Sequence, residues 1–164
     1  MSTAPESLIA PCFQDAPPIA AEVARGVTRL FCRQDLFAIC EVPLPNGRRA
    51  DMMAIDSKGG LTIVEIKVAK SDLLGDCKWT DYLEYCDRFF WAVPPNLAPI
   101  CEGERFLPNA AGLIVADRYD AVLARDASLR PLAPARRKAE LLRFARRAAR
   151  RLSAQIDPSL GDAF

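Results

Sequence analysis

Two charged side chains, Glu65 and Lys67, interrupt the apolar segment LTIVEIKVAK at residues 61–70. The segment is typical of a β-strand, and side chains alternate between the two faces of a strand. Glu65 and Lys67 therefore share one face with Leu61 and Ile63. Because an unpaired charge inside a protein is strongly destabilising, the two side chains need a partner or a cleft.

Asp51, on the strand predicted for residues 48–56, is the expected partner. If Ser57, Lys58 and Gly59 form a hairpin loop, Gly59 supplies the left-handed backbone conformation that such loops need. Asp51 would then share the face of Glu65 and Lys67, whereas a loop one residue longer would turn it to the opposite face. The expected register pairs Asp56 with Gly60, Ile55 with Leu61, Met53 with Ile63 and Asp51 with Glu65.

Two carboxylates on neighbouring strands repel each other unless a cation lies between them. An all-oxygen site suits Mg²⁺ or Mn²⁺, and Mg²⁺ typically takes one or two carboxylates together with water and substrate phosphate. The alternative is purely structural. In that interpretation Glu65 and Lys67 form a cross-strand ion pair on a half-exposed face, and Asp51 caps the end of its strand.

The composition narrows the possible chemistry. The chain has no histidine, which excludes Ser-His-Asp and Cys-His catalysis, histidine-ligated zinc and an imidazole general base. Its six cysteines show no C-x-x-C pair and no zinc-type spacing, which indicates reduced thiols. Catalysis would need carboxylates, lysine, tyrosine or a metal held by oxygen ligands.

The elements that must position these residues follow from hydrophobic periodicity. Their order predicts an α/β fold, a mixed central β-sheet flanked by helices. The length predicts a single domain, 1–164, with an extended N-terminal arm at 1–18, a core at 19–126 and a basic helix at 134–155. We expect helices at 19–34, 71–86 (with a possible break near Gly75) and 135–154, strands at 36–44, 48–56, 61–69, 88–94, 111–117 and 121–126, and a proline-rich loop at 95–110.

The segments RRAD at 48–51 and VEIK at 64–67 resemble the signature of the PD-(D/E)xK nuclease superfamily, which has the restriction-endonuclease-like fold. In that signature an acid at the start of one strand is followed by Glu-x-Lys on the next. Ala50 stands where the name-giving proline would be. The α-β-β-β-α-β core of the superfamily matches the expected element order, and residues 48–94 are more narrowly similar to the MmcB-like DNA repair proteins.

This resemblance implies roles for individual residues. Asp51 and Glu65 would hold a metal together with the backbone carbonyl of Ile66, and Lys67 would position or activate the attacking water. The activity implied is metal-assisted hydrolysis of phosphodiester bonds. Glu22 matches the helix glutamate of some members by place only, and its alternative role is a solvated side chain paired with a neighbouring arginine.

The segment CKWTDYLEYC at 77–86 is similar to a helical Q-x-x-x-Y element of recombination nucleases. Lys78 would replace the glutamine and Tyr82 would match the tyrosine, one helical turn apart on the same face. Such a pair suits a phosphate contact. The alternative is that Tyr82 packs in the core with Trp79 and Leu83.

An arginine-rich helix is expected near the C-terminus. Residues 130–164 hold nine Lys and Arg against three Asp and Glu, whereas residues 1–129 hold thirteen against eighteen. The helix carries an apolar stripe at Leu141, Ala145, Ala148 and Leu152, and its other faces are basic. Arginines bind phosphate well, so the expected DNA contacts are Arg143, Arg146, Arg147 and Arg150. Equally, these arginines could be solvated and paired with the acidic remainder of the chain.

We therefore expect a divalent-metal-dependent nuclease that hydrolyses DNA phosphodiester bonds in DNA repair, with Mg²⁺ or Mn²⁺ as cofactor and DNA as partner. The alternatives are a non-catalytic DNA-binding or scaffold protein with the same fold and, third, a structural or partner-binding domain. No apolar run reaches the length of a membrane span. The N-terminal segment lacks the pattern of a secretory signal, so the expected location is the cytoplasm.

Overall fold

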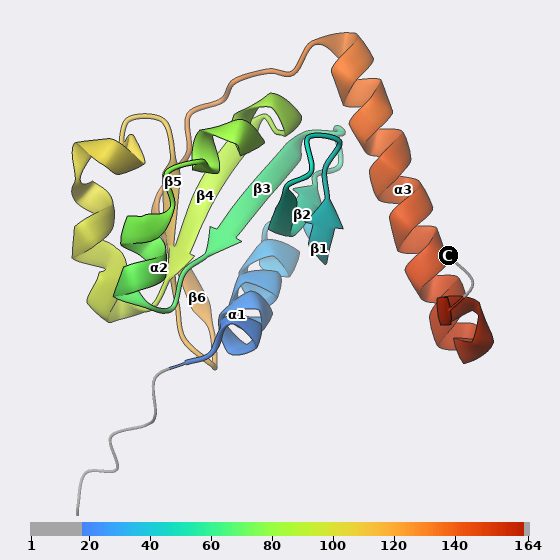
Figure 1. Ribbon diagram of the computed structural model, residues 1–164, viewed down its shortest axis with the longest axis horizontal. Coiled ribbons are helices and arrows are strands. Elements are labelled where there is room, and N and C mark those ends of the chain that lie inside the picture. Colours follow the sequence, from blue (N-terminus) through green and yellow to red (C-terminus); the bar gives the residue numbers. More distant parts are fainter. Residues whose placement is uncertain (1–17, 163–164) are drawn as a thin grey trace, which may run out of the picture.

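A six-stranded mixed sheet forms the centre of the computed structural model, which describes residues 18–162 (Figure 1). The strands lie in sequence order; β3–β4 and β4–β5 are parallel and the other neighbours antiparallel. The predicted α/β class and α-β-β-β-α-β order are therefore confirmed. All of the expected arm at 1–18 except Pro18 lies outside the described residues. The strands are β1 (Phe37–Pro43), β2 (Arg49–Ile55), β3 (Leu61–Ile66), β4 (Arg88–Val93), β5 (Gly112–Ala116) and β6 (Ala121–Arg125).

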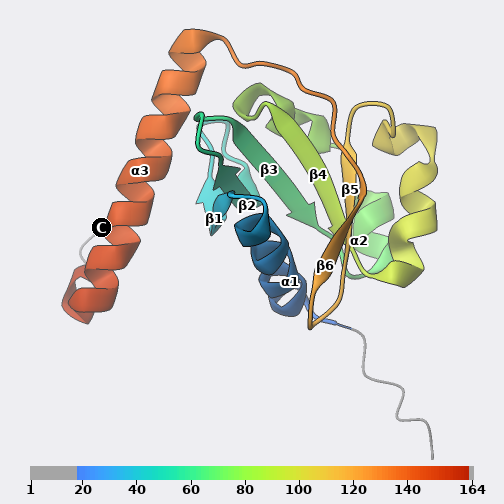
Figure 2. The same ribbon diagram turned by 180° about the vertical axis from the view of Figure 1, so that it is seen from behind.

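Helix α1 (Ala20–Arg33) covers one face of the sheet, as Figure 2 shows from behind. Its apolar residues recur at helical spacing, so Val23, Val27 and Phe31 face the sheet and are buried. They pack into a cluster with side chains such as Met52 and Val64 from the strands. Burial of this stripe fixes α1 behind the strands that carry the charged residues.

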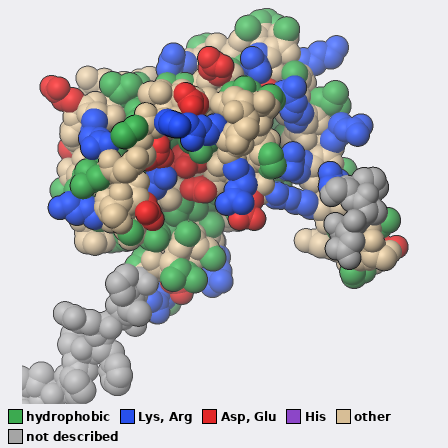
Figure 3. Space-filling view, in the orientation of Figure 1, with side chains coloured by type: hydrophobic (Ala, Val, Ile, Leu, Met, Phe, Trp, Pro, Cys, Tyr) green, Lys and Arg blue, Asp and Glu red, His purple; other side chains and the backbone are tan. Residues whose placement is uncertain are grey.

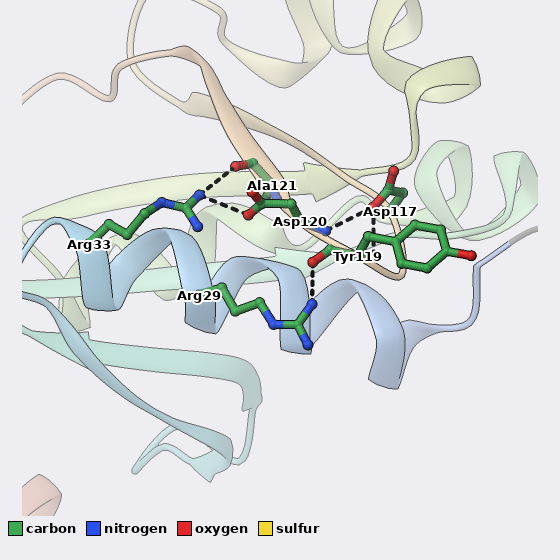
Figure 4. A network of polar contacts seen from close by, with 6 residues as sticks. All are labelled: Arg29, Arg33, Asp117, Tyr119, Asp120 and Ala121. Carbon is green, nitrogen blue, oxygen red and sulfur yellow. Dashed lines mark hydrogen bonds and ion pairs between the residues drawn. The ribbon is translucent and has the colours of Figure 1, made fainter.

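The β5–β6 hairpin is attached to α1 by arginines (Figure 4). Arg29 donates to the carbonyl of Tyr119, and Arg33 pairs with the carboxylate of Asp120 at 2.8 Å. The backbone passes so close to the helix that a Cβ atom at Gly26 would lie 2.8 Å from the carbonyl oxygen of Asp120. A glycine is needed at this close approach.

Short helices cover the opposite face, where an aromatic cluster around Trp91 and Phe89 is buried. The expected helix at 71–86 is divided after Gly75 into α2 (Lys70–Gly75) and a 3₁₀ helix, η1 (Trp79–Tyr85). The expected loop at 95–110 contains two further 3₁₀ helices, η2 (Pro95–Glu102) and η3 (Glu104–Phe106). These short turns place Trp79 and Phe106 against Trp91.

Helix α3 (Pro134–Ile156) stands beside the β1 edge of the sheet and is followed by η4 (Pro158–Asp162) (Figures 1 and 2). Its first turn is anchored by Arg137, whose guanidinium binds the buried carboxylate of Asp87 at 2.6 and 2.7 Å. Farther along the helix, Glu140 and Phe144 are buried, but Leu152 of the expected apolar stripe is 60% exposed. Fully buried side chains are therefore confined to the first half of the helix, and Arg151 in the second half contacts β1.

Candidate active site

The β2–β3 hairpin has the predicted register. Ile55 pairs with Leu61 and Met53 with Ile63, and Gly59 has a φ of +80°. The loop is closed by the N–H of Asp56, which donates to the carbonyl of Gly60 at 3.0 Å. Continued along the strands, this register sets Asp51 opposite Glu65.

Each carboxylate is held by the backbone of the opposite strand. The N–H of Asp51 donates to Oε1 of Glu65 at 3.2 Å, and the N–H of Ile66 donates to Oδ2 of Asp51 at 2.7 Å. The two acids therefore lie on the same side of the sheet. This result excludes the arrangement in which they point to opposite faces.

The positive charge near Asp51 and Glu65 is too small to offset their burial, so the pKa values of both acids are raised. Burial, followed by the nearby charge of Asp51, raises the pKa of Glu65 to about 8, and the side chain is 3% exposed. Burial also raises the pKa of Asp51. Without an added cation, Glu65 is largely protonated at neutral pH. The arrangement is that of a carboxylate pair whose ionisation a bound cation would favour.

Lys67 lies beside this pair but contacts a different acid more closely. Its Nζ is 2.9 Å from Oδ2 of Asp76 and 3.8 Å from Oε2 of Glu65. Burial opposes the ammonium form, but the hydrogen bond and charge of Asp76, with the charges of Glu65 and Asp51, raise the pKa of Lys67 above its ordinary value. Lys67 is therefore held protonated.

Asp76 was not identified as a site residue from the sequence. It follows the break at Gly75, and the α2 segment returns it to the end of β3. A signal was present in the sequence, because a carboxylate directly after a helix-breaking glycine lies in a connection that starts at the end of the Glu-x-Lys strand.

These side chains line one polar cleft, here called the Asp51 cleft. It is open to solvent and is formed by the start of β2, the end of β3, α2 and the side chain of Tyr82. Arg48 at its rim is paired with Asp81 at 3.0 Å, whereas Arg49 is exposed. The cleft is lined by Arg48, Arg49, Asp51, Glu65, Ile66, Lys67, Ser71, Asp72, Gly75, Asp76 and Tyr82.

Of the other residues predicted for the site, Tyr82 lies in the cleft, whereas Lys78 and Glu22 do not. Tyr82 lines the cleft and its hydroxyl donates to the carbonyl of Arg49 at 3.2 Å; burial raises the pKa of this phenol. Lys78 is exposed and does not line the cleft, because Trp79–Tyr85 is a 3₁₀ helix in which residues four apart do not align as in an α-helix. Glu22 is also outside the cleft lining, and its carboxylate accepts from the N–H of Ile19 at 3.1 Å.

A metal in this cleft would be held by the Asp51 and Glu65 carboxylates and the backbone carbonyl of Ile66, which also lines the cleft. Within residues 18–162 no group of three or more Cys, Asp or Glu side chains is arranged to hold a metal ion. One buried and one half-buried carboxylate, both with raised pKa values, fit a hard cation that keeps several of its waters, as Mg²⁺ does. The residues therefore fit Mg²⁺ or Mn²⁺ better than a metal that needs a full set of side-chain ligands.

The four arginines expected to contact DNA lie together along α3. They line a second hollow, here called the α3 groove, with Arg151, Ala149, Ser153, Ala154 and Leu160. Arg143 is partly neutralised, since its guanidinium is 2.5 Å from the buried carboxylate of Glu140. In the described part of the chain, no helix is both long and apolar enough to cross a membrane.

Comparison with known proteins gives one family and two solved structures. The family described as DNA repair protein MmcB-like matches residues 12–159. A protein of unknown function from Silicibacter pomeroyi is 41% identical, with a TM-score of 0.77 over 88% of this chain and 95% of that chain. A repair endonuclease from Pyrococcus abyssi is 18% identical, with a TM-score of 0.41 over 64% of this chain and 50% of that chain. No curated protein matches the chain.

Proposed function

Because this chain belongs to the MmcB-like DNA repair protein family, we propose that it is a divalent-metal-dependent nuclease that hydrolyses phosphodiester bonds of DNA. The observation that carries this proposal is the grouping of Asp51, Glu65 and Lys67 in one cleft. The strands bring the two acids together through backbone hydrogen bonds, so the acids are positioned before any ligand arrives. Such preorganisation is what electrostatic catalysis requires.

The Asp51 and Glu65 carboxylates and the Ile66 carbonyl would hold Mg²⁺ or Mn²⁺. When bound, the ion would polarise a phosphoryl oxygen and lower the pKa of a water molecule. The role of Glu65 is to lose its proton as the cation arrives, because the pKa of about 8 reflects burial beside another acid. Metal binding should therefore release protons near neutral pH.

Lys67 would supply positive charge on the other side of the reacting phosphate. Asp76 keeps the ammonium protonated and fixes its position, and Lys67 remains a hydrogen-bond donor across neutral pH. A protonated lysine can orient an attacking water or stabilise the charge that develops on the phosphate oxygens. It cannot serve as a general base in that state, so we assign it the positioning role.

The test is cleavage of single-stranded, duplex and branched DNA in the presence of Mg²⁺ or Mn²⁺. We expect the wild-type protein to cleave at least one substrate, and Glu65→Gln to lose activity roughly 10²–10³-fold because it keeps the shape but removes the negative charge. The control is Glu84→Gln, since Glu84 is exposed and outside the Asp51 cleft. Equal activity of wild type and Glu65→Gln would overturn the assignment of the site.

A second candidate, a non-catalytic DNA-binding or scaffold protein, is favoured by one observation. Nζ of Lys67 is nearer to Asp76 than to Glu65, so the lysine is already satisfied by an acid outside the expected triad. This candidate predicts intact DNA binding with no cleavage of any substrate class by the wild-type protein. Calorimetric titration with Mn²⁺ also distinguishes the two candidate functions. A nuclease must bind the metal, and Glu65→Gln should weaken that binding.

A further inference from the structure

The α3 groove is a concentration of positive charge that the Asp51 cleft does not explain. Five arginines line it, and no acidic side chain is part of the lining in the described residues. Figure 3 shows Lys and Arg side chains in blue along α3 and on the part of the body that faces it. Burial, followed by the charges of Arg151 and Arg150, lowers the pKa of Arg147, as expected where guanidinium groups crowd together. An anion in this groove would relieve that repulsion.

The groove is joined to the Asp51 cleft through strand β1. Arg151 donates to the carbonyls of Cys40 and Glu41, the latter at 2.9 Å. The pairs Cys40–Met52 and Val42–Ala50 set Glu41 opposite Asp51 across the β1–β2 ladder. Arg151, which lines the α3 groove, therefore contacts β1 at the position next to Asp51 of the cleft.

Arg49 adds positive charge between β1 and the Asp51 cleft. Its guanidinium is 3.7 Å from the carboxylate of Glu41, and Arg49 itself lines the Asp51 cleft. The Arg49–Glu41 pair is largely exposed, so it is weak and an incoming phosphate could replace Glu41 at little cost. Cationic side chains thus border a path from α3 to the two carboxylates.

We propose that the α3 groove and the Asp51 cleft form one track for the sugar-phosphate backbone of a nucleic acid. In this arrangement α3 holds the strand on one side of the scissile bond and Arg49 lies between the two parts. The inference rests on the proposed function for the role of the cleft. The binding of nucleic acid along α3 can be tested without it.

The groove is suited to phosphates rather than to bases. Its lining combines arginine with the small residues Ala149, Ser153 and Ala154, which let a backbone approach closely. No aromatic side chain lines it in the part of the chain that the structure describes, so it offers no stacking platform for bases. Recognition should be independent of sequence and strongly dependent on salt.

A membrane surface is the other anionic partner that a basic helix can meet. Of the exposed apolar side chains of α3, Leu142 is one helical turn from Arg146 and shares its flank, whereas Leu152 and Ile156 lie on a different flank from Arg150, given 100° per residue. The groove arginines are instead adjacent to the flank that carries Arg151 onto β1. This position favours a strand that continues into the cleft over a flat lipid surface.

The first experiment measures binding of fluorescein-labelled DNA of mixed sequence in EDTA, where no metal-dependent cleavage occurs. The test variant is Arg146→Gln/Arg147→Gln/Arg150→Gln, which spares Arg143 and its buried partner Glu140. We expect the Kd to rise tenfold or more, and the slope of log K against log salt to become shallower by about 2–3.

The matched control, Arg25→Gln/Lys58→Gln/Lys138→Gln, removes the same charge from exposed positions that line neither the α3 groove nor the Asp51 cleft. It should bind DNA within about twofold of wild type, since phosphate contacts act locally. Equal losses in the two triple variants would overturn the proposal, because net charge alone would then explain binding. The proposal would also be overturned if the arginine triple variant lost binding to phosphatidylglycerol vesicles but kept its binding to DNA.

A second experiment tests the continuity of the track. A photo-crosslinking residue replaces Ala149 in the groove or Ser71 in the cleft, and each protein is irradiated with the same end-labelled strand. The proposal predicts cross-links from both positions to one strand, at nucleotides a fixed distance apart. Cross-links to different strands, or at no fixed spacing, would overturn it. If DNA binding depends on the α3 groove but no substrate is cleaved, the nuclease assignment is wrong and the binding role of the groove is retained.

Discussion

The Asp51 cleft and the α3 groove carry opposite charges and hold them in opposite ways. In the cleft, the buried Glu65 and the half-buried Asp51 each accept a hydrogen bond from a backbone N–H group of the opposite strand. In the groove, most arginines extend from a helix that stands beside the core (Figures 1 and 3). Charge held in a fixed geometry by the backbone suits chemistry, whereas a row of arginines along a helix suits affinity for a flexible polyanion.

The largest effect is expected from a variant that removes the anchor between α3 and the sheet. Arg137→Met removes the partner of the Asp87 carboxylate, which is 4% exposed, and leaves a buried charge unpaired. We expect the free energy of unfolding to fall by about 4 kcal/mol. Urea denaturation measures it, with Arg130→Met as control, since the side chain of Arg130 is exposed. An unchanged stability would show that α3 is not anchored by this pair.

The next prediction tests the charge shortage in the cleft. Because the pKa of Glu65 in the folded protein, about 8, is above its ordinary value of 4.5, the folded state binds this proton more tightly than the unfolded chain does. Without metal, the free energy of unfolding should fall as pH rises between these two values. Glu65→Gln should be equal in stability to wild type near pH 4 and more stable by about 3 kcal/mol at pH 7, with the difference still growing towards pH 8.

Thermal unfolding in EDTA across this pH range measures the effect, with Glu84→Gln as the matched control. Mg²⁺ should raise the Tm of wild type and leave that of Glu65→Gln nearly unchanged, since the carboxylate is the binding group. If Glu65→Gln were less stable than wild type at high pH, ionised Glu65 would not destabilise the folded protein and the prediction would be wrong.

A smaller effect is expected at Asp76, which holds Lys67 in place. Asp76→Asn removes the charge that keeps the ammonium protonated and fixed at 2.9 Å, so we expect activity to fall about tenfold. The pH profile of kcat should also change, because the pKa of Lys67 drops. The control is Asp72→Asn, which alters another acid of the same cleft that has no ion pair with Lys67. Increased activity of Asp76→Asn would instead indicate that Asp76 restrains Lys67.

The smallest effect should come from Arg49, between the two regions. Arg49→Gln removes only an exposed ion pair with Glu41 at 3.7 Å, so stability should change by less than about 0.5 kcal/mol. DNA affinity at low salt should nevertheless fall severalfold, since one phosphate contact is lost. Fluorescence anisotropy alongside urea denaturation measures both. A loss of stability without a loss of affinity would remove Arg49 from the proposed track.

The hairpin and its acids could be predicted because they depend on local rules. A three-residue loop with Gly59 in the left-handed region sets the register, and the register sets Asp51 opposite Glu65. Asp76 could not be assigned in the same way. Its contact with Lys67 depends on how α2 returns to the end of β3, and that path is determined by packing of the whole layer.

The remaining differences also come from tertiary packing. Lys78 was expected one α-helical turn from Tyr82, but packing of Trp79 and Tyr82 against Phe89 accompanies a 3₁₀ helix. The amphipathic pattern of α3 correctly predicts a helix. It does not reveal that full burial ends halfway along the helix, because the same stripe of leucine and alanine is compatible with a covered or an exposed face.

Asp87 has a consequence for the order of folding. Its carboxylate accepts from the N–H of Leu61 at the start of β3, from the N–H of Leu132 and from Arg137, contacts that span 26, 45 and 50 residues. Closing such long loops costs entropy before it gives any stability. We therefore expect α3 to dock late, after β3 and β4 have paired, so the arginine helix is the last part of the molecule to reach its native place.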